Sequence, residues 1–370
     1  MAMRRLGPYD LERRIAIGGS SEIFLAHLAE GETRPGLTPG ETVVVKRPLP
    51  HVLEDPGLKV TFLQECQLAM AVDHPGLVRG LHAATPEEGG PYLVMEYIRG
   101  RSLLELLRVL EREAVAAQTA YREEHKDDPE YEGSELVVPL GFTALPAPYD
   151  VIAAIACQLG AALAWLHGMD PLFPRAAPLL HRDVHPRNIL IEDSGRVVLV
   201  DLGLVATAGE PLPPGADGWV SPEVRRGEPP AISSDLYSVG RVMWDLEHGF
   251  HHPGELDGFH VSFFELPALR NILVTSDDPG ARAFAAGKGI DDWEPGQYLT
   301  AWIARCLGFD PPGCADDLTT TMRGECLREL SDDGLLEVVS QWAQGVPTQV
   351  SEEEAVDAVI AAHPDDAAGP

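Results

Sequence analysis

Several features that mark particular classes of protein are scarce in this chain. Its 370 residues include only five cysteines, none of them in a C-x-x-C pair, so neither a disulfide framework nor a zinc motif is indicated. The start of the chain carries Arg4 and Arg5 but lacks the apolar core of a secretory signal. The longest apolar stretch, residues 151–166, contains Gln158 and falls short of the roughly 18 apolar residues that a membrane span needs. We therefore expect reduced thiols and a cytoplasmic protein that is not bound to a membrane.

Positive charge is also scarce. Against 58 Asp and Glu residues there are only 28 Lys and Arg residues, which gives a formal net charge of -30. A field of this sign repels phosphate backbones and anionic lipid headgroups, which excludes nucleic acid and membranes as general partners. A solvated acidic surface explains the charge more simply than a tuned preference for basic substrates does. The 45% hydrophobic content is ordinary for a globular protein and excludes disorder throughout.

The first hundred residues carry the signals of a small sheet with one helix. Two strands are predicted within residues 9–26, on either side of a turn at Gly18 and Gly19, and another at the β-branched residues 42–45. Apolar residues then recur at helical spacing over residues 62–70. The apolar run at residues 92–95 predicts a buried strand.

From Ser102 onward the patterns are mainly helical. Ser102 and Glu105 form a capping box, and Asp150 is placed to cap a long helix that ends at His167. Between these helices, residues 111–148 are crowded with charge and then with proline, which indicates an insertion. Residues 189–191 and 197–200 predict a hairpin, and a second capping box at residues 351–354 predicts a short helix in an acidic tail.

Six short segments follow one another in an order known from one family. Any one of them recurs often by chance, whereas all six in the right order do not. They are residues 16–23, 43–46, 62–65, 181–188, 201–203 and 221–223. The set resembles the motifs of protein kinases and is most similar to those of bacterial eukaryotic-like Ser/Thr kinases, over about residues 9–310.

This resemblance implies an α+β protein kinase fold with two lobes. The implied division is an N-terminal arm at residues 1–8, a β-rich lobe at 9–97, a larger mainly helical lobe at 98–330 and an acidic tail at 331–370. The implied cofactors are ATP and Mg²⁺. The implied partner is a protein substrate or a regulated protein.

The resemblance also implies a role for each charged residue of the motifs. Lys46 would hold the α- and β-phosphates and be steadied by Glu65, while Asp183 would orient the acceptor hydroxyl and take its proton. Asn188 and Asp201 would supply oxygen ligands to Mg²⁺. Taken alone, Lys46 fits a solvated strand lysine and Asp201 a turn former, so the assignment depends on the whole set.

The nucleotide pocket is implied by residues around the glycine turn and near residue 96. Backbone amides at Gly18 and Gly19 can approach phosphates because glycine has no Cβ. The residues implied to surround the nucleotide are Ile15, Ile23, Val44, Met95, Glu96 and Ile98.

The sequence departs from the family pattern at several positions. The family lysine two places after the catalytic Asp is His185 here, its threonine partner aligns with Ala216, and the arginine that pairs with Glu223 aligns near Cys314. Milder changes are Ala16, Ser21, Val44 and Leu202. Three functions remain open on this evidence: a Ser/Thr protein kinase, an ATP-binding pseudokinase that acts as a scaffold or allosteric partner, and a kinase of small molecules.

Two further groups of residues have competing explanations. His248, His251 and His252 could ligate a metal but fit a polar loop better, since no Cys or carboxylate stands at fixed spacing. Thr207 is the phosphorylation candidate after Asp201, and Arg182 could bind its phosphate.

Overall fold

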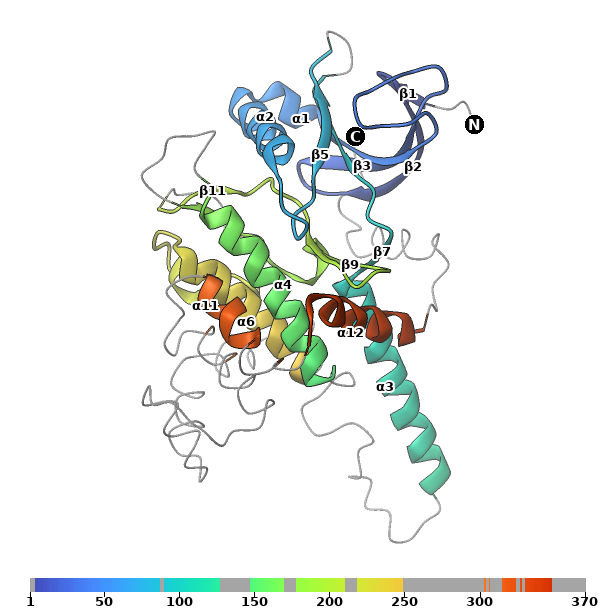
Figure 1. Ribbon diagram of the computed structural model, residues 1–370, viewed down its shortest axis with the longest axis vertical. Coiled ribbons are helices and arrows are strands. Elements are labelled where there is room, and N and C mark those ends of the chain that lie inside the picture. The colour runs from blue at the N-terminus through green and yellow to red at the C-terminus, as the bar shows by residue number, and fades with distance from the viewer. Residues whose placement is uncertain are drawn as a thin grey trace. The chain divides into compact units, whose positions relative to one another are not determined.

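The computed structural model describes residues 4–86, 90–126, 147–169, 178–209, 218–248, 303, 306, 315–323, 327 and 330–347. These residues form two units, one within residues 1–99 and the other within residues 100–347 (Figure 1). The chain therefore passes from the β-rich first unit to the mainly helical second unit near residue 99.

A six-stranded antiparallel sheet makes up most of the first unit. Its strand order is β1-β2-β3-β4-β6-β5, and β-bulges interrupt the register of β2 and β3 near Arg13 and Ala16. Bulges increase local twist, and these strands curl in Figure 1. The strands are β1 (Arg4–Leu6), β2 (Tyr9–Ile17), β3 (Ser21–Leu28), β4 (Thr42–Pro48), β5 (Gly80–Ala84) and β6 (Tyr92–Glu96).

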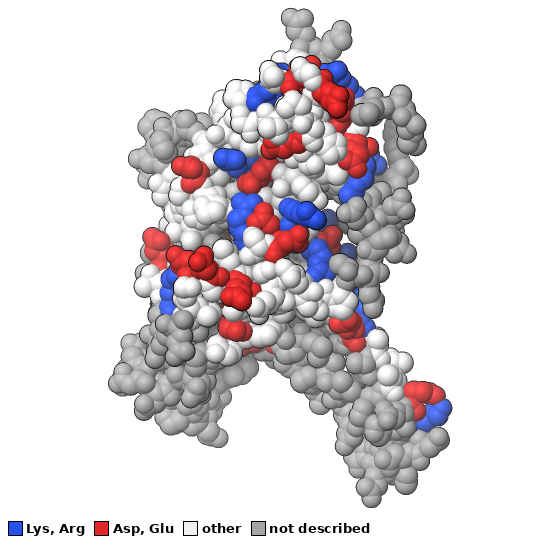
Figure 2. All heavy atoms as spheres, turned by 45° about the vertical axis from the view of Figure 1, so that its right-hand side comes forward, with Lys and Arg blue, Asp and Glu red and all other residues white. Residues whose placement is uncertain are grey.

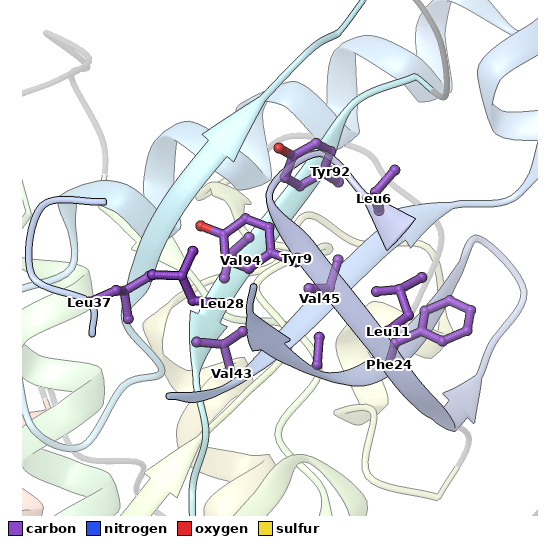
Figure 3. Packing of buried hydrophobic residues seen from close by; sticks show 11 residues of the cluster. Leu6, Tyr9, Leu11, Phe24, Leu28, Leu37, Val43, Val45, Tyr92 and Val94 are labelled. Carbon is purple, nitrogen blue, oxygen red and sulfur yellow. The ribbon is translucent and has the colours of Figure 1, made fainter. Parts of the chain in front are cut away.

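The core of this unit lies on one face of the sheet. Val43 and Val45, two residues apart on β4, are fully buried, as is Tyr9 on β2. Figure 3 shows these side chains gathered with those of Tyr92 and Val94. Because side chains alternate along a strand, Val44 and Lys46 lie on the opposite face of β4.

Two helices follow β4: α1 (Pro50–Glu54) and α2 (Pro56–Ala71). Asp55 caps α2 by accepting hydrogen bonds from the amides of Gly57 and Leu58, and Pro56 stands in the first turn, where its missing N–H costs nothing. The helix packs against β5 so closely that a Cβ on Gly80 would lie 2.8 Å from the Ala69 carbonyl carbon. Glycine at position 80 therefore allows α2 to lie on the sheet.

The second unit contains two small sheets and several helices. One sheet has the order β10-β9-β7, and in the other β11 pairs with β8. The capping box of Ser102 and Glu105 and the hairpin of β9 and β10 are both present, as predicted. The elements are β7 (Gly100–Ser102), α3 (Leu103–His125), α4 (Tyr149–His167), β8 (Leu179–Leu180), η1 (Pro186–Asn188), β9 (Ile189–Glu192), β10 (Val197–Leu199), β11 (Ala206–Thr207), α5 (Pro222–Arg225), α6 (Ile232–His248), α11 (Ala315–Thr321) and α12 (Asp332–Gly345).

Helix α4 forms the core of the second unit and packs against α6, α11 and α12. Its N-cap is Pro148, so the prediction that Asp150 caps this helix is wrong; the Asp150 carboxylate instead accepts a hydrogen bond from the amide of Val151. By length and composition α4 would suffice to cross a membrane, contrary to the expectation that no segment would, but 67% of its apolar window is buried inside the fold. Its apolarity is accounted for by the core.

Helix α12 lies within the predicted acidic tail but is part of the folded second unit. Leu335, Val339 and Ala343 are buried, and α12 packs against α4 and β9. Arg101 holds the end of the helix by donating to the carbonyls of Ala343, Val346 and Pro347, the last two at 2.9 and 3.2 Å. Residues 331–347 thus belong to the second unit, and the boundary at residue 330 is too early. The predicted helix from residue 351 lies outside the described residues, as do residues 127–146 of the predicted insertion.

Candidate active site

The first unit supplies a buried ion pair. Lys46 lies on β4 and Glu65 on α2, and the Lys46 Nζ is 2.5 Å from the Glu65 Oε1. The two residues are only 3% and 6% exposed. Removing two charges from water is expensive, so a pair this deeply buried depends on both partners. The adjacent Cys66 is also buried, and this burial, followed by the charge of Glu65, raises the pKa of its thiol to about 12.

The strand register places several of the residues predicted to bind nucleotide on the same face as Lys46. Ile23 pairs with Lys46, and Val44 pairs with Met95, and residues directly opposite in a sheet share a face. Val44 and Lys46 share it too, since they are two apart on β4. This face is the one opposite the Tyr9 core.

The remaining predicted nucleotide residues lie at the edges of this face. Gly18 and Gly19 form the exposed turn between β2 and β3, where the Gly18 amide donates to the Ser21 carbonyl at 2.8 Å. A Cβ on Gly19 would meet nothing within 4 Å, so the backbone there is open to a ligand. Ile15 lies at the second bulge of β2, and Glu96 ends β6, with its amide donating to the Arg79 carbonyl. Ile98 follows and is buried.

The second unit brings three predicted site residues into contact in the loop after β8. Asn188 donates from Nδ2 to the Asp183 Oδ2 at 2.8 Å and to the Asp183 backbone carbonyl at 3.0 Å. His185 Nε2 is 3.5 Å from the same Oδ2. The loop can close in this way because η1 turns the chain back between Asp183 and Asn188, which stand five positions apart.

The orientation of His185 follows from its own contacts. Its Nδ1 accepts a hydrogen bond from the Arg187 amide, which caps η1, so the proton of the neutral ring is on Nε2, facing Asp183. The imidazole also packs against the indole of Trp219, with ring centroids 5.7 Å apart. The place of the family lysine is therefore taken by a ring that is held in position.

Asp201 follows β10 and lies beside the same loop. The Val200 amide donates to the Asn188 carbonyl at 2.8 Å, which ties the two segments together. Asp201 has a φ of 64°, in the left-handed region that Asp tolerates better than most residues, and its Oδ1 accepts the Gly203 amide. The carboxylates of Asp183 and Asp201 both lie close enough to His181 to act on its titration.

Asp235 on α6, which is not among the predicted site residues, supports this loop. Its carboxylate is buried and accepts the amides of His181 and Arg182, both at 2.8 Å, and His167 Nε2 at 2.9 Å. Arg182 has a φ of 68°, a strained value for a long side chain, and these hydrogen bonds hold it there. Burial alone would raise the pKa of Asp235, but the hydrogen bond and charge of His167, together with His181 and the hydrogen bond from the Arg182 amide, outweigh burial and lower it. Burial lowers the pKa of His181.

The structure describes some of the other residues at which the sequence departs from the family pattern. The Glu223 Oε1 accepts a hydrogen bond from Ser234 Oγ at 2.9 Å, which gives this carboxylate a neutral partner. Thr207 lies on β11, paired with Leu179. Ala216, Cys314, His251 and His252 lie outside the described residues. Among the residues that the structure describes, no group of three or more side chains that could hold a metal ion is found.

The architecture and these contacts agree with what comparison with known proteins finds. The protein kinase domain matches residues 35–258, which include Lys46, Glu65, the loop from His181 to Asn188, and Asp201. The chain belongs to the protein kinase family, and the predicted α+β kinase fold is confirmed. The matched range begins after the turn at Gly18 and Gly19.

Its relatives include bacterial kinases. It is 29% identical over 252 residues to serine/threonine-protein kinase PknB of Mycolicibacterium smegmatis, covering 65% of this chain and 32% of that protein. It is 27% identical over 248 residues to tyrosine-protein kinase MasK of Myxococcus xanthus, again covering 65% of this chain and 32% of that protein. The chain thus spans about a third of the length of these curated relatives. The resemblance to bacterial eukaryotic-like kinases is confirmed.

We expect Asp235→Asn to lower the free energy of unfolding by about 2–4 kcal/mol at pH 7. An amide offers one accepting oxygen where the carboxylate offers two, and its NH₂ would face a backbone donor, leaving a buried group unsatisfied. The measurement is chemical denaturation, with the exposed Asp73→Asn as a control that should change stability by less than about 0.5 kcal/mol.

The same pair of proteins provides a test of pH dependence. Because the folded pKa of Asp235 is lowered, its stabilising contribution is complete above the unfolded value of about 3.9 and is lost as pH falls through the folded value. The gap between wild type and Asp235→Asn should therefore narrow only below about pH 4. A gap that narrows between pH 8 and pH 5 would contradict this explanation.

Proposed function

We propose that this chain is an active protein kinase that transfers the γ-phosphoryl group of ATP to Ser or Thr hydroxyls of a protein, in the cytoplasm. The observation that carries the proposal is the preformed contact of Asp183 with Asn188, beside Asp201. Family membership and relatives named as Ser/Thr kinases support it. The second candidate, a pseudokinase, gains no support, because Lys46, Glu65, Asp183, Asn188 and Asp201 are all present.

The residues present fit the nucleotide and its metal ion. Asn188 commits its amide nitrogen to Asp183, which leaves its amide oxygen to act as a ligand, and Asp201 adds a carboxylate; oxygen donors of this kind are what Mg²⁺ prefers. Lys46, steadied by Glu65, would bind phosphate oxygens. When bound, the metal ion neutralises charge that develops on the phosphoryl oxygens.

The rest of the chemistry falls to Asp183. Its carboxylate would orient the acceptor hydroxyl and take its proton as the oxygen attacks phosphorus. Asn188 fixes the position of this carboxylate through Oδ2, and Asp235 fixes the loop that carries it. Positioning of this kind provides most of the rate enhancement in phosphoryl transfer, since little covalent work is left to the protein.

The test is incubation of the purified chain with Mg²⁺ and γ-labelled ATP, followed by mass spectrometry of the modified residues. We expect label on Ser or Thr, and a rise in thermal stability with Mg²⁺ and ATP equivalent to about 2.7 kcal/mol at 100 times the dissociation constant. Label on Tyr alone would change the acceptor class. Stabilisation by nucleotide without any transfer, to itself or to added proteins, would favour the pseudokinase.

A further inference from the structure

Three arginines gather beside the catalytic loop of this acidic chain. Arg108 and Arg112 lie one helical turn apart on α3, so their side chains share a face. Arg187 lies on η1, which packs against α3. Arg112 and Arg187 are exposed and Arg108 is half-buried.

The charges of this arginine cluster are unbalanced. Burial lowers the pKa of Arg108, and the positive charges of Arg187 and Arg112 lower it further, against opposing contributions from Glu111 and Glu105. Glu105 is meanwhile committed to the capping box, where it accepts the Ser102 amide. The like charges are therefore close enough to destabilise one another.

Other arginines of the second unit are used differently. Arg196 pairs with Glu192, Arg226 with Glu228, and Arg323 with Asp332, while Arg101 binds carbonyls at the end of α12. Among the residues that the structure describes, no such ion pair is formed by the three guanidinium groups of the arginine cluster. Within the described part of the chain, their positive charge is thus not neutralised by an ion pair.

The cluster is well placed to meet a substrate. Arg187 lies between Asp183 and Asn188 in the sequence, and its amide is bonded to His185, so it belongs to the loop that receives the acceptor hydroxyl. A peptide with its hydroxyl at Asp183 must pass this loop on one side or the other. Guanidinium groups bind carboxylates in a bidentate fashion, which suits recognition of Asp and Glu side chains.

We infer that Arg108, Arg112 and Arg187 form a subsite for acidic residues that flank the phosphorylated Ser or Thr in a protein substrate. This inference rests on the proposed function and names its substrate class. It is the opposite of the preference for basic substrates that the net charge of -30 alone would favour. A short acidic peptide fits better than nucleic acid, because the net charge of -30 would repel a long polyanion. On the face that Figure 2 shows, the described Asp and Glu residues are interspersed with Lys and Arg residues.

The experiment measures binding of fluorescein-labelled Ser peptides that are identical except for Glu, Gln or Lys at the flanking positions. Fluorescence anisotropy is recorded with wild type, with the variant carrying Arg108→Gln, Arg112→Gln and Arg187→Gln, and with Lys126→Gln. Lys126 is an exposed cation at the end of the same helix, about 27 Å from Arg108 at 1.5 Å per residue, so Lys126→Gln matches each single Arg→Gln variant in net charge.

We expect the Glu peptide to bind wild type about tenfold more tightly than it binds the triple variant, since each exposed ion pair contributes up to about fivefold. Lys126→Gln should bind like wild type, and the preference for the Glu over the Gln peptide should weaken as salt is raised. Because Arg112 and Arg187 are exposed, their single Gln variants should fold normally and each show part of the loss. The rate of phosphoryl transfer should follow the same order of peptides.

Equal binding of the Glu and Gln peptides by wild type, or equal binding of the Glu peptide by wild type and the triple variant, would overturn the subsite. So would a single-stranded DNA oligonucleotide that binds with the same dependence on the three arginines. The Asp183→Asn variant separates the two proposals, because it lacks the proposed base but keeps the arginine cluster. It should bind the Glu peptide like wild type. Arginine-dependent binding without transfer in wild type would support the subsite and count against the proposed function.

Discussion

Asp183→Asn is expected to lower the rate of phosphoryl transfer by about 10²- to 10⁴-fold, the range that a positioned general base contributes. An asparagine fills the same space but cannot accept the hydroxyl proton. The Asn188 amide can still donate to the side-chain oxygen at position 183, so the loop should keep its conformation. The rate is measured as single-turnover transfer from labelled ATP.

Nucleotide binding provides the control for Asp183→Asn. The stabilisation by Mg²⁺ and ATP should match wild type within error, because Asn188, Asp201 and Lys46 are unchanged. Asp333→Asn, at an exposed carboxylate on α12, should leave both transfer and binding unchanged. A variant at Asp183 that transfers at more than about a tenth of the wild-type rate would show that this carboxylate is not the base.

Lys46→Met should have the second large effect, and it should act on stability as well as on catalysis. The substitution removes the cation from a buried pair and leaves the Glu65 carboxyl group buried without it, which costs about 3–5 kcal/mol of unfolding free energy. It also removes the proposed contact with the phosphates, so the stabilisation by Mg²⁺ and ATP should be lost.

The double variant Lys46→Met with Glu65→Leu separates the two effects. Replacing a buried ion pair with apolar residues of similar volume is often neutral or stabilising, so most of the lost stability should return. Phosphoryl transfer and nucleotide-dependent stabilisation should not return with it. The measurements are denaturant titration and thermal shift on the same four proteins, wild type, two single variants and the double. If either single variant were as stable as wild type, the two residues would not be coupled as the 2.5 Å contact implies.

The elements that the sequence predicted well are those with strong local signals. The β-branched strand next to Lys46, the capping box at Ser102 and the hairpin after Asn188 each depend on neighbours within a few residues. The site residues came from an ordered set of motifs, and Asp183 and Asn188 do meet because η1 closes the short loop between them.

The features that were missed depend on distant parts of the chain. Asp235 bonds to amides 53 and 54 residues earlier in the sequence, and nothing near it predicts these partners. Its one local signal was a carboxylate in the apolar face of a helix. For α12 the negative charge of Asp332 and Asp333 suggested a tail, whereas apolar residues at 335, 339 and 343 recur at helical spacing and predict the buried face.

The tip of the β9–β10 hairpin packs directly against α12, so substitutions in these two segments are expected to depend on one another. Gly195 has a φ of 87°, and a Cβ there would lie 1.8 Å from the Leu336 carbonyl oxygen of α12. The neighbouring Asp193 carbonyl accepts hydrogen bonds from Ser340 and Gln344 of the same helix. No side chain can be added at position 195 unless α12 moves away and gives up those bonds. During divergence, position 195 and the face of α12 that covers it are therefore expected to change together, so that a relative with a larger residue at the hairpin tip should carry a differently docked helix at its C-terminal side.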